Sequence, residues 1–190
     1  MRPGVAIIVL WVGFALSWVL AAFWSDKTAK RAGIRQEIGY RVVQFPGWIL
    51  LAVPAHRYFG PLRLWHVTWT EAWVCAGLIA LGFAFAWWAR IYLGPVWSSS
   101  VTRKVNHRVI DSGPYALVRH PIYTGILLAV YATTAAKGTV LGIAAAVLVT
   151  VGFWLKARLE ERWLCAELGS GEYQAYRRKV PMLLPFGPKA

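Results

Sequence analysis

The sequence predicts an all-α membrane protein with about five transmembrane helices and a helical tail on the cytoplasmic side. Hydrophobic residues make up 58% of its 190 residues, and the mean hydropathy of +0.48 is too high for a soluble domain of this size. The 12 tryptophans indicate the same class, because indole rings favour the interface between bilayer and water. We expect one domain, with three spans in residues 1–93 and a loop, a helical hairpin and the tail in residues 94–190.

The net charge of +13 does not indicate nucleic-acid binding. The basic residues fall in the gaps between apolar runs, where Lys and Arg fix the orientation of a membrane protein and meet anionic lipid headgroups. The two cysteines, Cys75 and Cys165, lie far apart in the chain, and no spacing of cysteines or histidines is typical of a metal site. We therefore expect membrane lipids as partners, and neither nucleic acid nor metal.

Three apolar runs occupy the first half of the chain. Val5–Trp24 contains no charge and is long enough to span a bilayer. The alternative for this run is a signal peptide, whose apolar region has only about 7–15 residues. Val42–Ala55 is short for a span and is interrupted by Pro46 and Pro54. Ala72–Ala89 is predicted as the third span.

Two further spans are predicted to form an antiparallel hairpin. One covers Pro121–Ala136, since proline is tolerated in the first helical turn, and the other covers Gly138–Leu155 after a very short connection. Gly138 and Gly142 form a G-x-x-x-G pattern that would let the helices approach closely. The basic segment Ser25–Arg41 indicates a cytoplasmic loop. Five spans then place the N-terminus outside and the C-terminus inside, in the plasma or inner membrane.

Residues 106–125 form a polar stretch that membrane topology does not require. The stretch lies between long apolar runs and contains two of the four histidines. His120 shares one helix face with Tyr123 and Thr124, and free backbone N–H groups in the first helical turn favour an anionic group. Each of these side chains could be an interfacial anchor, but together with His107 and Tyr115 they predict a site for a polar cofactor at the membrane surface.

The tail from residue 156 onward offers two carboxylates, Glu160 and Glu161, directly after the fifth span. Adjacent residues on a helix point about 100° apart, so we expect only one of the two to face the site. The alternative is a solvated helix with an ion pair such as Glu161 to Arg158. Topology places this tail on the same face of the membrane as the polar stretch.

Three motifs resemble those of a known family. They are G-P-Y-x-x-x-R-H-P-x-Y-x-G over residues 113–125, E-E-x-x-L over residues 160–164, and a G-x-x-Y-x-x-Y pattern, offset by one residue, over residues 169–176. This order resembles the isoprenylcysteine carboxyl methyltransferase family, and integral-membrane phospholipid methyltransferases share it. The resemblance covers the half of the chain from about Asn106 to Pro185. It implies a helical membrane enzyme that binds S-adenosylmethionine at the cytoplasmic face and methylates a lipophilic acceptor entering from the bilayer.

The resemblance also implies roles for particular residues. Those expected to bind the cofactor are His107, Val109, Gly113, Tyr115, His120, Pro121, Tyr123 and Gly125. Glu160 or Glu161 would close the site from the tail, and Arg177 would face the acceptor. These three are the candidate catalytic residues.

The sequence leaves the acceptor open. An isoprenylcysteine-type carboxylate or another lipid-like small molecule is the first expectation, and the amine of a phospholipid is the alternative. A membrane reductase that uses NADPH is a rival enzyme class of related architecture, although here proline directly follows the histidine. A non-enzymatic scaffold or a small transporter is a rival of another class, but the strong spans contain no charged residue at mid-span.

Overall fold

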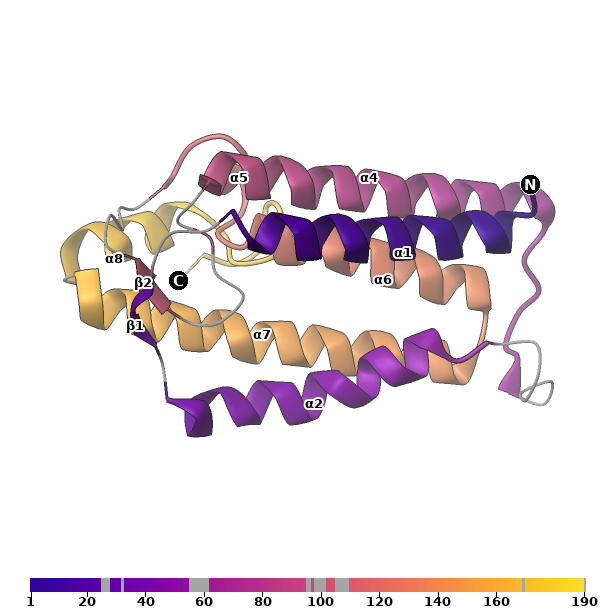
Figure 1. Cartoon of the computed structure of the whole chain (residues 1–190), viewed down its shortest axis with the longest axis horizontal. Coiled ribbons are helices and arrows are strands. Elements are labelled where there is room, and N and C mark those ends of the chain that lie inside the picture. Colours follow the sequence, from indigo (N-terminus) through magenta and orange to yellow (C-terminus); the bar gives the residue numbers. More distant parts are fainter. Residues whose placement is uncertain are drawn as a thin grey trace.

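Five long helices lie side by side and make up the body of the protein (Figure 1). The computed structural model describes residues 1–24, 28–31, 33–54, 62–94, 97, 102–104, 110–168 and 170–189. The long helices are α1 (Pro3–Ala22), α2 (Ile34–Ala52), α4 (Trp69–Leu93), α6 (Pro121–Lys137) and α7 (Val140–Leu168). The short elements are α5 (Pro114–Leu117), α8 (Ser170–Lys179), β1 (Thr28–Arg31) and β2 (Thr102–Lys104), and they gather at one end of the bundle together with the C-terminus.

Within the residues that the structure describes, three helices are long and apolar enough to cross a membrane: Pro3–Ala22, Trp69–Leu93 and Val140–Ala166. The prediction of a polytopic, helical membrane protein is confirmed. The prediction of five spans goes beyond this finding, because α6 has only 17 residues and α2 carries Arg35, Glu37 and Arg41. Both nevertheless lie beside α7 in the bundle (Figure 1).

Two element boundaries differ from those predicted, and each difference adds charged residues to a helix. Helix α2 begins at Ile34 rather than Val42, where Glu37 and Arg41 form an ion pair one turn apart. Helix α7 continues without a break through the charged residues after Leu155. The antiparallel pair of β1 and β2 was not predicted either. It joins two polar segments whose short length gives no recognisable periodicity.

Helices α4 and α6 come into very close contact at Gly82 and Gly125. A Cβ atom added to Gly125 would lie 2.4 Å from the carbonyl oxygen of Gly82, and one added to Gly82 would lie 2.5 Å from the carbonyl oxygen of Gly125. Only glycine permits this approach. Close helix contact was predicted instead at Gly138 and Gly142. In the structure Gly138 ends α6 with a φ of 60°, against the carbonyl oxygen of Trp65.

A charged side chain ties neighbouring helices together at each end of the bundle. At the end that carries α8, the fully buried Arg90 donates hydrogen bonds to the carbonyl oxygens of Ala21 in the last turn of α1 and of Trp24 just after it. At the other end, Lys137 donates to the carbonyl oxygens of Leu51 and Val53, which end α2. Each cation thereby binds carbonyl groups at the C-terminal end of a helix, where cations are favourable.

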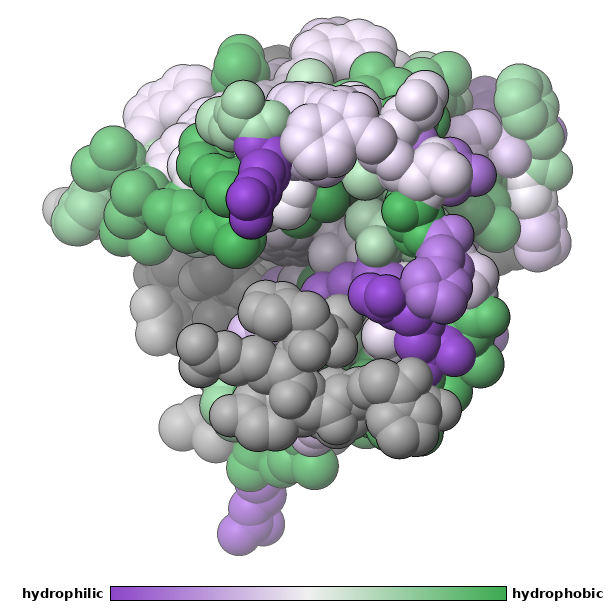
Figure 2. All heavy atoms as spheres, turned by 90° about the vertical axis from the view of Figure 1, so that its right-hand side faces the viewer, coloured by the Kyte–Doolittle hydropathy of each residue, from purple (hydrophilic) through white to green (hydrophobic). Residues whose placement is uncertain are grey.

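The two ends of the molecule differ in polarity. Apolar and weakly polar side chains predominate among the coloured residues of the end opposite α8, with hydrophilic ones scattered between them (Figure 2). The end with α8 contains Arg177, Arg178 and Lys179 in the last turn of that helix alone. The polar elements therefore gather at one end, and the candidate site lies there.

Candidate active site

The tail returns to the start of α6 and pairs with it. The backbone N–H groups of Arg119 and His120 donate to the carbonyl oxygens of Pro181 and Met182, at 2.9 and 3.1 Å. The hydroxyl of Thr124 donates to the carbonyl oxygen of Leu183 at 2.6 Å. The R-H-P segment and the tail, which are some 60 positions apart in the chain, thus become adjacent walls of one site.

His120 lies between the two adjacent carboxylates of α7. Its Nδ1 is 3.5 Å from Oε2 of Glu160, and its Nε2 is 3.3 Å from Oε1 of Glu161. We expected only one glutamate to face the site; both contact His120, and of the two only Glu161 lines the cavity between α6 and α7. The 100° between adjacent helical side chains is spanned by the imidazole ring, whose two nitrogens lie on opposite sides. The ring also stacks on Tyr123, with 5.3 Å between centroids and 3° between planes.

Glu160 faces a partly buried group of aromatic and cationic side chains. The Tyr123 hydroxyl donates to its Oε1 at 2.6 Å, and Nζ of Lys156 lies 4.0 Å from the same oxygen. This ammonium also lies 5.2 Å from the ring centre of Tyr123 and 5.7 Å from that of Tyr40 on α2. Cations favour the faces of aromatic rings, so this side of the site already contains the kind of group that binds a positive charge.

Glu161 faces two arginines. Nε of Arg119 is 2.6 Å from Oε1, and Nε of Arg177 is 3.1 Å from Oε2. Arg119 also donates from Nη1 to the carbonyl oxygens of Arg177 and Val180. The alternative pair of Glu161 with Arg158 is therefore not formed. The Arg177 Nε–H is not aligned with the carboxylate and is left buried without a hydrogen-bond acceptor.

The charges around His120 favour its protonated form. Burial alone lowers the pKa of a histidine, but the hydrogen bonds and negative charges of Glu160 and Glu161 outweigh it, so the pKa of His120 is raised above its usual range. Burial also raises the pKa of Tyr115 and of Tyr176, which keeps both hydroxyls neutral at physiological pH.

Of the remaining predicted residues, Gly113, Tyr115 and Pro121 fix the backbone near this cluster. Gly113 has a φ of 57°, and an added Cβ would meet the Tyr92 ring at 2.7 Å. Tyr115 is buried, and its carbonyl oxygen accepts a hydrogen bond from Tyr176 of the tail at 2.7 Å. Pro121 is fully buried in the first turn of α6. Gly125 packs on α4, and its role in cofactor binding stays a prediction. His107 and Val109 lie outside the described residues.

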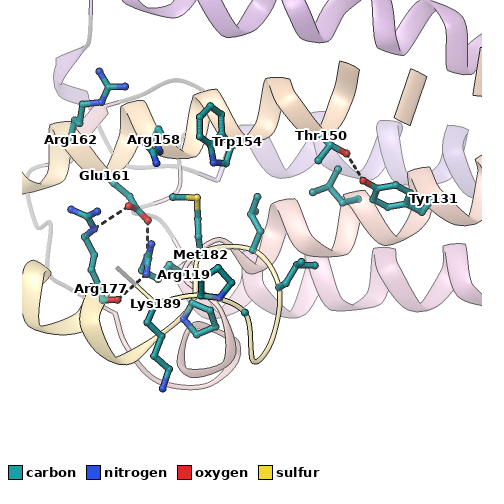
Figure 3. A pocket seen from close by; sticks show the side chains of 16 residues that line it. Arg119, Tyr131, Thr150, Trp154, Arg158, Glu161, Arg162, Arg177, Met182 and Lys189 are labelled. Atoms are coloured by element: carbon teal, nitrogen blue, oxygen red, sulfur yellow. Dashed lines mark hydrogen bonds and ion pairs between the residues drawn. The ribbon is translucent and has the colours of Figure 1, made fainter. Parts of the chain in front are cut away.

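A cavity of about 690 Å³ runs from this cluster along the interface of α6 and α7 (Figure 3). Its polar end is formed by Arg119, Glu161 and Arg177. Its walls combine residues of α6, residues of α7 and the tail segment after α8: Leu127, Tyr131, Thr150, Trp154, Arg158, Arg162, Pro181, Met182, Leu183, Leu184, Gly187, Pro188 and Lys189. The size is that of a site for a small organic molecule.

Several residues of the site were not predicted from the sequence. Lys156 and Tyr40 contribute to the Glu160 side, and the carbonyl groups of the tail bind Arg119 and Thr124. Lys156 was assigned only to a charged tail, although its spacing of four from Glu160 is a recognisable ion-pair signal. Within the described residues, no group of three or more His, Cys, Asp or Glu side chains could hold a metal ion.

A family model described as phospholipid methyltransferase matches residues 70–169, which is more than half of the chain. The chain belongs to this family. The matched residues contain α4, the R-H-P segment, the hairpin of α6 and α7, and both glutamates. The resemblance inferred from the sequence motifs is thereby confirmed.

Three curated relatives illustrate the range of this similarity. Methanethiol S-methyltransferase 2 of Bradyrhizobium diazoefficiens is 46% identical over 71 residues, 37% of this chain and 26% of its own. The cobalt-zinc-cadmium resistance protein CzcN of Cupriavidus metallidurans is 28% identical over 63% of this chain and 55% of its own. The protein-S-isoprenylcysteine O-methyltransferase of Schizosaccharomyces pombe is 31% identical over 59% and 48%. The chain thus spans between a quarter and just over half of the length of these relatives.

Proposed function

We propose that this protein is an S-adenosylmethionine-dependent methyltransferase that acts on a lipophilic acceptor at the cytoplasmic face of the membrane. The observation that carries the proposal is the buried cluster of His120, Glu160 and Glu161, which adjoins the polar end of a cavity through Glu161, in a chain of the phospholipid methyltransferase family. The relatives named for methyl transfer to methanethiol and to isoprenylcysteine support the reaction class.

The donors and acceptors of the site fit this cofactor. Bound S-adenosylmethionine would supply a methyl group on a sulfonium, open to direct displacement. Arg177, whose buried Nε–H has no hydrogen-bond acceptor, would hold the carboxylate of the methionine moiety. Glu160 would hold the ammonium group. Its carboxylate and the neighbouring Tyr123 ring already bind one ammonium, that of Lys156, so this side of the site suits a positive charge. His107, Val109, Gly113, Tyr115, His120, Pro121 and Gly125 would complete the cofactor site.

The residues of the chain would act mainly by alignment and by exclusion of water. A direct displacement requires donor and acceptor atoms to be in line, and a buried site prevents competing hydrolysis. The tail segment that covers the R-H-P residues provides this cover. A carboxylate acceptor needs no general base, whereas an amine or a thiol must lose a proton. Arg177 is the candidate for positioning the acceptor, and Glu160 or Glu161 is the candidate for accepting that proton.

We also propose a topology. Helices α2 and α6 would cross the membrane beside α7, which gives five spans, an external N-terminus and a cytoplasmic C-terminus. The support for this is their packing along α7 and the gathering of the polar elements at one end (Figure 1). Residues 1–93 would provide three spans, and residues 94–190 would provide the catalytic half. The acceptor would enter sideways from the bilayer, along the cavity between α6 and α7.

Binding of the cofactor tests the proposal directly. Purified protein in an uncharged detergent is titrated with S-adenosylmethionine or with NADPH, and thermal unfolding is recorded, because a ligand raises the unfolding temperature by mass action. We expect a shift with S-adenosylmethionine alone. The joint variant His120→Ala with Tyr123→Ala should abolish it, and Arg178→Gln, on the exposed face of α8, should not. A shift with NADPH alone would instead support a reductase.

The acceptor is identified by product analysis. Membrane lipid extract is supplied together with methyl-labelled cofactor, and the labelled product is characterised by mass spectrometry. Label in a methyl ester would indicate a carboxylate acceptor, and label in a headgroup amine would indicate the phospholipid alternative. Binding of S-adenosylmethionine without any transfer of label, to lipid extract or to a prenylated cysteine, would contradict a lipophilic acceptor.

A further inference from the structure

The face of α7 that lines the cavity is uncharged at one end and cationic at the other. Thr150, Trp154 and Arg158 follow one another at a spacing of four residues and all line the cavity (Figure 3). Residues four apart lie one above another on a helix. The eight residues from Thr150 to Arg158 correspond to about 12 Å along the axis. The face thus presents a hydroxyl, then an indole, then a guanidinium, towards the polar end of the site.

The hydroxyl end of this face does not need a polar ligand. The Tyr131 and Thr150 hydroxyls are 2.8 Å apart, and Thr150 donates its own proton to the carbonyl oxygen of Ala146. Tyr131 therefore donates to Thr150, and both protons are used within the protein. With Leu127 on the neighbouring wall, this end of the cavity suits the hydrocarbon part of a ligand.

The guanidinium of Arg158 is held in place but carries no paired charge. Its central carbon lies 4.7 Å from the ring centre of Trp154, a cation–π contact of the kind that arginine favours. Among the residues that the structure describes, no carboxylate forms an ion pair with it. Glu161, the nearest candidate one turn further on, is bound by Arg119 and Arg177.

The charge of the cavity favours an anion at this position. Five basic side chains line it, and the acidic side chain among its lining residues is Glu161. Arg162 and Lys189 point away from the centre of the cavity (Figure 3), and Arg119 and Arg177 face Glu161. Arg158 is therefore a cation of the groove with which no described carboxylate forms an ion pair, and it lies away from Glu161, where it can bind an anionic ligand group.

We propose that Arg158, stacked on Trp154, binds an anionic group of the acceptor and selects amphiphiles with a phosphate or carboxylate over uncharged ones. The hydrocarbon part lies towards Tyr131 and Thr150, the indole of Trp154 contacts the junction, and the anion lies beside Arg158. This places the polar part of the acceptor one helical turn from Glu161, at the end where methyl transfer is proposed. The inference rests on the proposed function for what happens to the acceptor, but the binding itself does not require methyl transfer.

The test compares amphiphiles that differ only in the headgroup. Wild-type protein in an uncharged detergent is titrated calorimetrically with oleoyl lysophosphatidic acid, oleate and monooleoylglycerol. We expect the two anions to bind at least tenfold more tightly than the glycerol ester, since a charge-assisted hydrogen bond to arginine is stronger than a neutral one. The stronger of the two anions shows whether the site prefers phosphate or carboxylate.

Variants then assign the preference to Arg158. Arg158→Gln should lower the affinity for the preferred anion about tenfold and leave that for monooleoylglycerol unchanged, and Arg158→Lys should lose less. Arg178→Gln is the matched control, because it removes an exposed arginine outside the cavity. Equal loss for charged and uncharged ligands, unaltered affinity in Arg158→Gln, or no binding by wild type would overturn the proposal. Binding of S-adenosylmethionine, measured on the same variants, should not change, so failure of the cofactor site and failure of the anion site give different results.

Discussion

The two interfaces of α6 differ in a way that chain order does not suggest. Helix α4, which is distant in sequence, packs most extensively against α6, and Gly82 and Gly125 bring the two backbones into contact. Helix α7 follows α6 after a very short turn, but the two enclose a cavity that ends in a charged cluster. A short connection therefore makes two helices antiparallel neighbours but does not determine how closely they pack. The rigid contact with α4 holds one wall of the site, and the looser interface with α7 leaves room for ligands.

The largest expected loss of stability comes from a substitution at the polar end of the α6–α7 interface. Glu161→Gln removes the buried carboxylate that faces Arg119 and Arg177. Loss of one partner from a buried pair costs about 3–5 kcal/mol, because the remaining charge stays buried. Chemical unfolding in detergent micelles would measure the free energy of unfolding. Glu71→Gln, at an exposed helix start, is the control and should cost less than about 1 kcal/mol. A loss of similar size in both variants would show that Glu161 is not a buried structural charge.

The next largest loss of stability is expected from a substitution at the α4–α6 interface. Gly125→Ala would place its Cβ 2.4 Å from the carbonyl oxygen of Gly82, so the helices must separate. Overpacking of this kind costs about 1–3 kcal/mol, and we expect a lower unfolding temperature. Gly77→Ala on α4 is the matched control, because nothing lies within 4 Å of its added Cβ; alanine there should stabilise the helix by up to about 1 kcal/mol. Equal stability of the two variants would contradict close contact at Gly125.

A third prediction uses pH to probe the α6–α7 interface at His120. Its pKa is raised in the folded state, above the unfolded value of about 6.5. The stabilisation from the charged imidazole is therefore fully present below about pH 6.5 and is lost as the pH rises through the folded pKa. Unfolding temperatures measured from pH 5.5 to 9 should fall across this window for the wild type. His120→Asn should remove this part of the dependence. A wild-type profile that is flat, or that rises with pH, would contradict a charged His120.

The smallest expected effect concerns the hydrogen bond at the apolar end of the cavity between α6 and α7. Tyr131→Phe removes one hydrogen bond to Thr150 between α6 and α7 and leaves the aromatic ring. The cost should be about 0.5–1.5 kcal/mol, measured by thermal unfolding. We expect the affinity for oleate to stay the same, because this end contacts hydrocarbon. A marked loss of oleate affinity would instead indicate that the hydroxyl binds the ligand.

Much of the architecture follows from local sequence. An uncharged run of twenty residues such as Val5–Trp24 favours a helix in the bilayer, because lipid offers no hydrogen bonds to the backbone and a helix satisfies its groups internally. The observed α1 covers almost the same residues. The R-H-P motif marked the polar end of α6, and the stacking of His120 on Tyr123 follows from helical spacing. Charged helix extensions such as the start of α2 were missed, since their charges resemble those of a cytoplasmic loop.

The sequence by itself determined the class of the protein, and it predicted which side chains carry the chemistry and in which order they follow along the chain. Hydropathy, helical period and motif spacing are local properties, and each can be evaluated within a few turns of helix. Only the tertiary structure decided that His120 contacts both Glu160 and Glu161. It also decided that the carbonyl groups of residues 180–183 bind the start of α6, and that Arg158 remains available in the cavity. Each of these contacts joins groups some 40 to 60 positions apart in the chain. Which partner a charged group binds therefore depends on how the helices pack, and local sequence does not specify this.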